Sequence, residues 1–102
     1  IIKNRYSAFA QGSSCIERVL RSREIDTVLV GGTKTNVCCD STARDAMMLD
    51  FKSVMVSDCC AASSDDEHLA SLETFIQQFG DVMTSEEVME RMIRRNDAAA
   101  AE

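Results

Sequence analysis

Two adjacent cysteines, Cys38 and Cys39, follow a glycine pair in the stretch GGTKTNVCCDSTARDA. The apolar run IDTVLV before the glycines is typical of a buried strand, and the residues from about 36 to 49 have helical spacing. Cys38 is therefore predicted to lie in the first turn of a helix, at the carboxyl end of a strand. Backbone N–H groups there stabilise a thiolate and a developing oxyanion, which is what a cysteine nucleophile needs.

The two thiols are predicted to lie in different environments. Cys39, Ala43 and Ala46 follow i, i+4, i+7 spacing and form a small apolar stripe suited to packing on a sheet. Cys38 lies about 100° away around the same helix. This spacing predicts a structural Cys39 and a reactive Cys38. The alternative is that both are small core residues, since free cysteine is among the most buried residue types.

The other thiols give no sign of a metal site. The chain has five cysteines, four of them in adjacent pairs, and C-x2-C or C-x4-C spacing is absent. Reduced thiols in a cytosolic protein are the simpler interpretation, and we expect no metal and no organic cofactor. Cys59 and Cys60 follow a second strand at its carboxyl end, where one of them would border a pocket or both would pack in a loop.

Length and charge exclude several classes of function. The chain has 102 residues, a net charge of −6 and 45% hydrophobic residues, which suits one small domain or part of a larger one. The acidic balance gives nucleic-acid or anionic-membrane binding little support. No apolar run approaches the roughly 20 residues of a membrane span, and no signal peptide is visible. Because there is no initiator Met, we expect the true amino terminus to lie upstream.

The elements that must position the cysteines alternate along the chain. Strand, helix, strand with short connections is a βαβ unit, which implies parallel strands and a right-handed crossover. The fold class is thus α/β, with helices on both faces of the sheet. Strands are predicted at about 26–30, 52–57 and 81–83, and helices at 13–23, 36–49, 64–79 and 84–95.

Three helix starts carry a capping-box pattern, in which a Ser or Thr precedes a Glu by three residues. The three capping pairs are Ser14 with Glu17, Ser64 with Glu67, and Thr84 with Glu87.

The tail NDAAAAE, residues 96–102, is predicted to be frayed or disordered. The predicted sheet has two or three strands, which are few for a parallel sheet that must be buried on both sides.

Two motifs carry a family resemblance. KNRYSAF at 3–9 and GGTKTNVCCDSTARDA at 31–46 resemble the isochorismatase-like cysteine hydrolases, whose pattern is K-x-R-Y/F-S-x-F and then G-x-x-T-N-x-C-V-x-S-T-A-R-D-A. The match extends through VSDCCAA and DEHLASLETF to FGDVMT. That group includes nicotinamide amidohydrolases, and the match is closest to the amidohydrolases that act on small carbamoyl or ureido compounds, of the ureidoacrylate, biuret or N-carbamoylsarcosine type. The resemblance implies a three-layer α-β-α fold with a parallel Rossmann-like sheet, of which residues 1–95 would be the carboxyl-terminal portion.

The resemblance also implies roles for individual residues. Cys38 would be the nucleophile and Lys3 the lysine of the catalytic triad. The bond between Thr33 and Lys34 matches the position of a non-proline cis peptide, which would direct the N–H groups of Lys34 and Cys38 toward the oxyanion. Tyr6 would line the substrate pocket or lie at the edge of the core.

The family's third catalytic group is an aspartate base far upstream of the lysine. This sequence begins two residues before Lys3, so the resemblance covers a carboxyl-terminal half that lacks this aspartate. We therefore expect a complementary amino-terminal chain or another copy to complete the sheet, as a homo-oligomer in the second case. None of the acids Asp26, Asp40, Asp45 and Asp58 occupies the position of the base.

The resulting hypothesis is a cytoplasmic protein that hydrolyses a C–N bond in a small molecule with a cysteine nucleophile, through a thioester and without nucleic-acid or membrane partners. One alternative is an inactive fragment or non-catalytic subunit. Another is a vinyl-ether hydrolase of the isochorismate type, against which Cys38 argues. His68 is interpreted as a partly buried helix residue or a subunit contact, although a Cys–His dyad is conceivable. Arg44 and Asp45 are interpreted as a structural pair.

Overall fold

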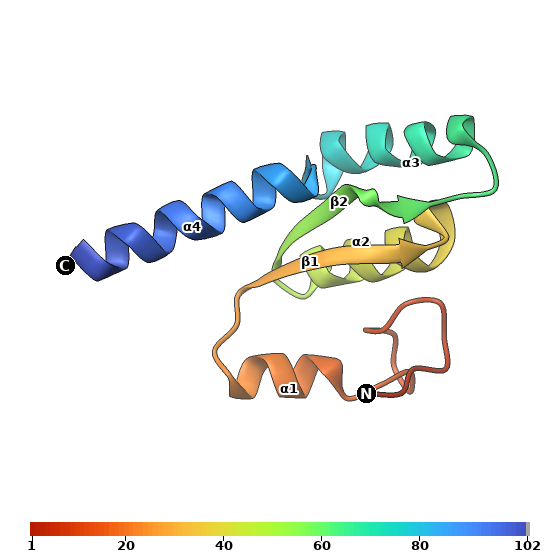
Figure 1. Ribbon diagram of the computed structural model, residues 1–102. Coiled ribbons are helices and arrows are strands. Elements are labelled where there is room, and N and C mark those ends of the chain that lie inside the picture. The colour runs from red at the N-terminus through yellow and green to blue at the C-terminus, as the bar shows by residue number, and fades with distance from the viewer. Residues whose placement is uncertain (102) are drawn as a thin grey trace.

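Three parallel strands form the sheet of the part of the chain that the structure describes, residues 1–101 of a computed structural model (Figure 1). They are β1 (Thr27–Thr33), β2 (Lys52–Ala61) and β3 (Asp81–Met83), in that spatial order. β2 pairs on both sides, whereas β1 pairs only with β2 and has an open edge. The predicted α/β class and parallel sheet are confirmed.

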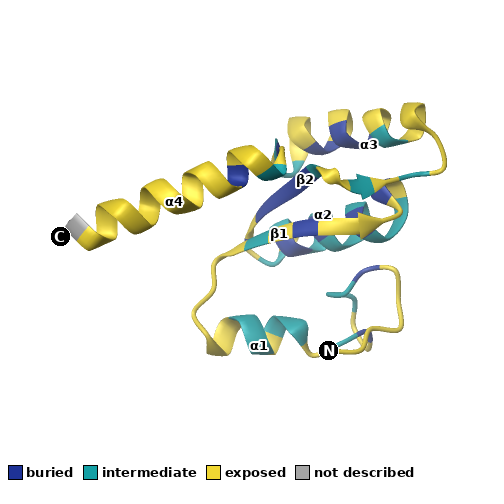
Figure 2. Cartoon of the chain, in the orientation of Figure 1, coloured by how far each residue is buried: buried dark blue, intermediate teal, exposed yellow. Residues whose placement is uncertain are grey.

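Helices flank this sheet unequally. Figure 2 shows burial concentrated on β2, α2 and the inner side of α3, while most of α4 is exposed. Within the described residues, no helix is long and apolar enough to cross a membrane. The helical elements are α1 (Ile16–Ser22), a π-helical turn η1 (Thr35–Cys39), α2 (Asp40–Met48), α3 (Asp65–Gln78) and α4 (Ser85–Ala101).

Two apolar clusters lie on opposite faces of the sheet, because side chains alternate along β2. Met55 points into the larger cluster with Phe75 of α3 and Ala43 of α2, all three fully buried. Val54 and Val56 form the smaller cluster with Met83 and with Val88 of α4. One face is thus covered by α2 and α3, and the other only by the first turns of α4.

The pairing of β1 with β2 contains a bulge. Val30 is the partner of Met55, but Gly32 is the partner of Cys60, so β2 holds extra residues opposite Gly31. Gly32 has φ +131°, a conformation that side chains rarely adopt. The strand predicted to end at residue 57 therefore continues to Ala61, and Cys59 and Cys60 lie in a strand rather than in a loop.

Two of the three predicted caps are confirmed. Ser64 Oγ accepts the Glu67 N–H at 3.2 Å, and Thr84 Oγ1 accepts the Glu87 N–H at 3.2 Å while Glu87 Oε1 accepts the Thr84 N–H at 3.1 Å. The prediction for Ser14 was wrong, because its hydroxyl donates to the Ala8 carbonyl and accepts the Ile16 N–H. That hydroxyl ties the start of α1 to the preceding loop.

The end of the chain also differs from the prediction of a frayed tail. α4 continues without a break through Ala101. Alanine has the highest intrinsic helix propensity, which favours continuation of the preceding helix through this run. Residue 102 lies outside the described residues.

Gly80, which joins α3 to β3, sets a steric limit on this connection. A Cβ there would clash with the Ser53 carbonyl oxygen and would lie 3.1 Å from the ring of Phe75. Gly80→Ala is expected to lower the free energy of unfolding by about 1–3 kcal/mol, as overpacking does. Urea denaturation measures this, with Gln78→Ala at an exposed position as the control. Equal free energies of unfolding for the two variants would show that the connection accommodates the added methyl group without loss of stability.

Candidate active site

A groove of about 720 Å³ runs along β1 on the side of α1. Its walls are mostly apolar, with Ile16 and Leu20 of α1 facing Val28 and Leu29 of β1. Lys3, Thr33, Cys38 and Thr42 supply polar or reactive groups at the end where β1 runs into η1. The structure thus brings Lys3 and Cys38, which are far apart in sequence, to one groove at the carboxyl end of a strand. Ligands of open α/β sheets bind at this end.

The adjacent cysteines differ in burial, as their spacing predicted. Cys38 is half-buried and lines the groove, whereas Cys39 is 3% exposed and belongs to the larger apolar cluster. Burial raises the pKa of Cys39 to about 12, and the neighbouring Cys60 thiol adds to this shift. Cys39 therefore stays a neutral thiol at physiological pH, and its structural role is supported by both its packing and its charge state.

Cys38 lies in the π-helical turn η1 rather than in the α-helix that was predicted to start near residue 36. The Lys34 carbonyl accepts the Val37 N–H at 3.2 Å and the Cys39 N–H at 3.1 Å. A π turn holds one more residue than an α turn, and such turns recur at functional sites. Hydrophobic periodicity could not reveal the π turn, because the extra residue depends on the tertiary contacts that hold the two ends of the turn.

The segment before α1 places Lys3 at the groove through contacts with α2 and the residues after it. The Ala8 N–H donates to Thr42 Oγ1 at 3.0 Å, and the rings of Phe9 and Phe51 lie 5.6 Å apart. Lys3 Nζ donates to the carbonyls of Arg5 at 2.8 Å and Tyr6 at 3.3 Å. The ammonium group is thus held by its own loop at the groove that Cys38 lines.

The cis peptide bond that the resemblance implies is present, whereas Tyr6 does not line the groove. The Thr33–Lys34 peptide bond is cis, and Thr33 lines the groove while Lys34 is exposed. Tyr6 is 68% exposed and is not among the residues that line this groove. Its side chain therefore does not form a wall of this groove.

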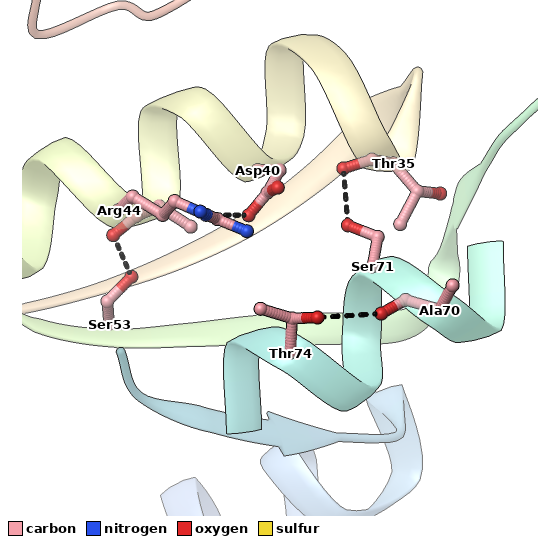
Figure 3. Close-up of polar contacts among 8 residues, drawn as sticks. Thr35, Asp40, Arg44, Ser53, Ala70, Ser71 and Thr74 are labelled. Atoms are coloured by element: carbon pink, nitrogen blue, oxygen red, sulfur yellow. Dashed lines mark hydrogen bonds and ion pairs between the residues drawn. The ribbon is translucent and has the colours of Figure 1, made fainter. Parts of the chain in front are cut away.

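The acidic residues that could have served as a base have other partners. Asp40 Oδ1 accepts from Arg44 Nε at 2.7 Å (Figure 3), so the predicted pair of Arg44 with Asp45 was wrong: residues four apart share a helix face. Asp58 accepts the Ser85 hydroxyl at 2.6 Å and the Ser85 N–H at 2.7 Å, and these bonds lower the pKa of its carboxyl. Neither aspartate lines the groove.

Among the described residues, no group of three or more His, Cys, Asp or Glu side chains is arranged so that it could hold a metal ion. Cys59 is exposed, and the Cys60 thiol donates to the Val30 carbonyl oxygen at 3.7 Å on β1. Burial raises the pKa of Cys60. Neither thiol lines the groove, which favours a packing role for this pair.

Sequence reasoning missed one contact to the turn that contains Cys38. His68 Nδ1 of α3 lies 2.7 Å from the hydroxyl of Thr35, the first residue of η1. His68 is therefore bonded to Thr35, and no hydrogen bond joins it to Cys38 among the described residues. The only signal in the sequence was that this one histidine lies near the start of a helix.

Lys3→Ala is expected to slow alkylation of Cys38 at neutral pH by about three- to tenfold, because a nearby cation stabilises a thiolate. The measurement is the rate of iodoacetamide labelling at Cys38, followed by peptide mapping. Lys52→Ala, at an exposed lysine outside this groove, is the matched control. If both variants label at the wild-type rate, Lys3 has no electrostatic role at Cys38.

Comparisons with known proteins agree with this geometry. The isochorismatase domain family matches residues 1–87. Enterobactin synthase component B of Escherichia coli K12 is 36% identical over all of this chain and 35% of its own length. The ureidoacrylate amidohydrolase RutB of Acinetobacter baylyi is 36% identical over 78% of this chain and 32% of its own. The crystal structure of a cysteine hydrolase from Pseudomonas syringae superposes with a TM-score of 0.85 and 37% identity, covering 90% of this chain and 47% of that one.

The fold and the groove define an α/β protein with a parallel sheet and a ligand-sized groove at the carboxyl end of a strand. The chain belongs to the isochorismatase family of hydrolases. It spans about half or less of the length of the relatives that it matches.

Proposed function

We propose that this chain supplies the nucleophile for hydrolysis of a C–N bond in a small amide, carbamoyl or ureido compound. The observation that carries the proposal is the contrast between the two cysteines. Cys38 lines a groove with Lys3 and Thr33, whereas Cys39 is buried with its thiol protonated. The amidohydrolase names among the relatives, maleamate and ureidoacrylate, point to the same substrate class.

The reaction would proceed in two steps. The Cys38 thiolate attacks the carbonyl carbon, and backbone N–H groups of the Lys34–Cys38 turn stabilise the oxyanion. The C–N bond then breaks, and ammonia or an amine leaves with the proton that the proton acceptor took from the thiol. A thioester remains on Cys38, or a thiocarbamate when the substrate is a carbamoyl or ureido compound. Water attacks the thioester, a carboxylic or carbamic acid is released, and the thiol is restored.

A proton acceptor is also required, and the described aspartates Asp40 and Asp58 are engaged elsewhere. We propose that a carboxylate comes from a segment that adds to the open edge of β1, in a complementary chain or another copy. The same addition would complete the pocket that determines the substrate. All five cysteines are free, which suits the reducing cytoplasm as the location.

Labelling with iodoacetamide tests the proposal against thiols of the same chain. Cys15 and Cys59 are exposed and lie outside the groove, so they serve as internal references. Half-buried Cys38 is expected to react about ten times faster than either at neutral pH, as an activated thiolate does. Labelling of Cys38 at or below the rate of Cys15 would instead support a non-catalytic subunit.

A second candidate is hydrolysis of an isochorismate-type vinyl ether, which is favoured by the family name and by the match of enterobactin synthase component B to all of this chain. That reaction needs no thiol nucleophile. Activity on such a substrate that survives complete alkylation of Cys38 would support this candidate, and loss of ammonia release on alkylation would support C–N hydrolysis.

A further inference from the structure

α3 contacts the nucleophile turn through two polar side chains. His68 Nδ1 lies 2.7 Å from Thr35 Oγ1, and Ser71 Oγ donates to the Thr35 carbonyl oxygen at 3.5 Å. Figure 3 shows the second contact, with Ser71 reaching from α3 to the start of η1. Both groups of Thr35 that can form hydrogen bonds across this interface, its hydroxyl and its carbonyl, are therefore bound by α3.

Thr35 is well placed to transmit this contact. It is fully buried, and it is the first residue of η1, three residues before Cys38. Its carbonyl also accepts the Asp40 N–H, which closes the π turn around the nucleophile. The residue before it, Lys34, forms no side-chain cap. Side-chain bonds from α3 therefore hold the first residue of this uncapped turn in place.

α3 is a firm support for these bonds. Leu72 and Phe75 anchor it in the larger apolar cluster, and Ser64 caps its amino terminus. His68 is half-buried between this anchored part and η1. Either neutral tautomer of the ring permits the contact, because the threonine hydroxyl can donate to Nδ1 or accept from it.

We propose that His68 is a positioning residue for the nucleophile. Its bond to Thr35 holds the η1 turn so that the Cys38 thiol and backbone N–H keep their place at the groove. Loss of the ring leaves a buried hydroxyl without its partner, and the turn relaxes away from the geometry that activates the thiol. This role rests on the proposed function of Cys38, although the contact itself does not.

The ratio of Cys38 to Cys15 labelling rates tests the proposal, measured on the 102-residue chain in the assembly it forms in solution. His68→Ala is expected to lower the ratio about tenfold. His68→Asn should restore most of it, because its side-chain amide reaches the position of Nδ1. Thr35→Val should lower the ratio as His68→Ala does, and the double variant should lower it no further. Thr74→Ala is the matched control, since its hydroxyl bonds only to Ala70 of its own helix (Figure 3).

Amide hydrogen exchange of residues 35–39 gives a second readout that does not depend on thiol activation. Faster exchange in His68→Ala than in Thr74→Ala is expected. Unchanged exchange, or an unchanged labelling ratio in folded His68→Ala, would overturn the positioning role. A wild-type ratio near one would count against the proposed function instead, and exchange would then still decide whether His68 holds the turn.

Discussion

Cys38→Ser is expected to abolish C–N hydrolysis, with a loss of about 10³-fold or more, while the fold is kept. A serine hydroxyl is a far weaker nucleophile than a thiolate unless a matched base activates it. Cys38 is half-buried at the groove, and it is not a member of the buried apolar clusters, so the exchange of sulfur for oxygen costs little stability. The measurement is ammonia release from ureido and amide compounds, with circular dichroism to follow folding.

Cys39→Ala is the matched control, because it removes the neighbouring thiol. Cys39 is 3% exposed in the larger cluster, so its loss should lower the free energy of unfolding by about 1 kcal/mol and leave activity largely intact. An inactive Cys39→Ala together with an active Cys38→Ser would reverse the assignment of the two thiols.

The second large effect is expected in the state of association. β1 pairs only with β2, so its outer edge presents unpaired N–H and C=O groups. Leu29 on this strand is 49% exposed and borders both the groove beside α1 and a second groove of about 880 Å³ beneath α4. We expect the purified chain to associate through this edge rather than persist as an active monomer.

Sedimentation velocity measures this association. Leu29→Lys is expected to shift the chain toward a monomer, because a charge on the edge strand opposes pairing. Leu69→Lys is the control, at an exposed leucine of α3 outside both grooves. A monodisperse monomer that unfolds cooperatively and hydrolyses a ureido compound would contradict the expectation, and the base would then have to be sought among the acids of this chain.

Local patterns predicted most of the fold. The three strands, their parallel pairing and the caps at Ser64 and Thr84 were predicted from residues close in sequence, and all of them are present. Two features required knowledge of distant contacts. The continuation of β2 to Ala61 depends on a bulge in its pairing with β1, and the Ser14 hydroxyl is bound by the Ala8 carbonyl.

The features of the candidate site also divide into those that local sequence predicts and those that depend on distant contacts. The difference between Cys38 and Cys39 follows from helical spacing, and the structure gives them the expected difference in burial. Residue types alone gave no reason to place Lys3 at the same groove, and the resemblance supplied it. The bond of His68 to Thr35 joins residues 33 positions apart, so no local pattern could have revealed it.

The π turn also has a consequence for how the length of this chain can vary among related genes. Its first residue, Thr35, is held by α3, and its last, Cys39, is buried in the apolar cluster. The number of residues between two such anchors cannot change without pulling one of them from its partners. Gly12, in contrast, lies in a turn where a Cβ would meet nothing within 4 Å. Insertions and deletions in an alignment of related genes should therefore fall near Gly12 and be excluded between Thr35 and Cys39.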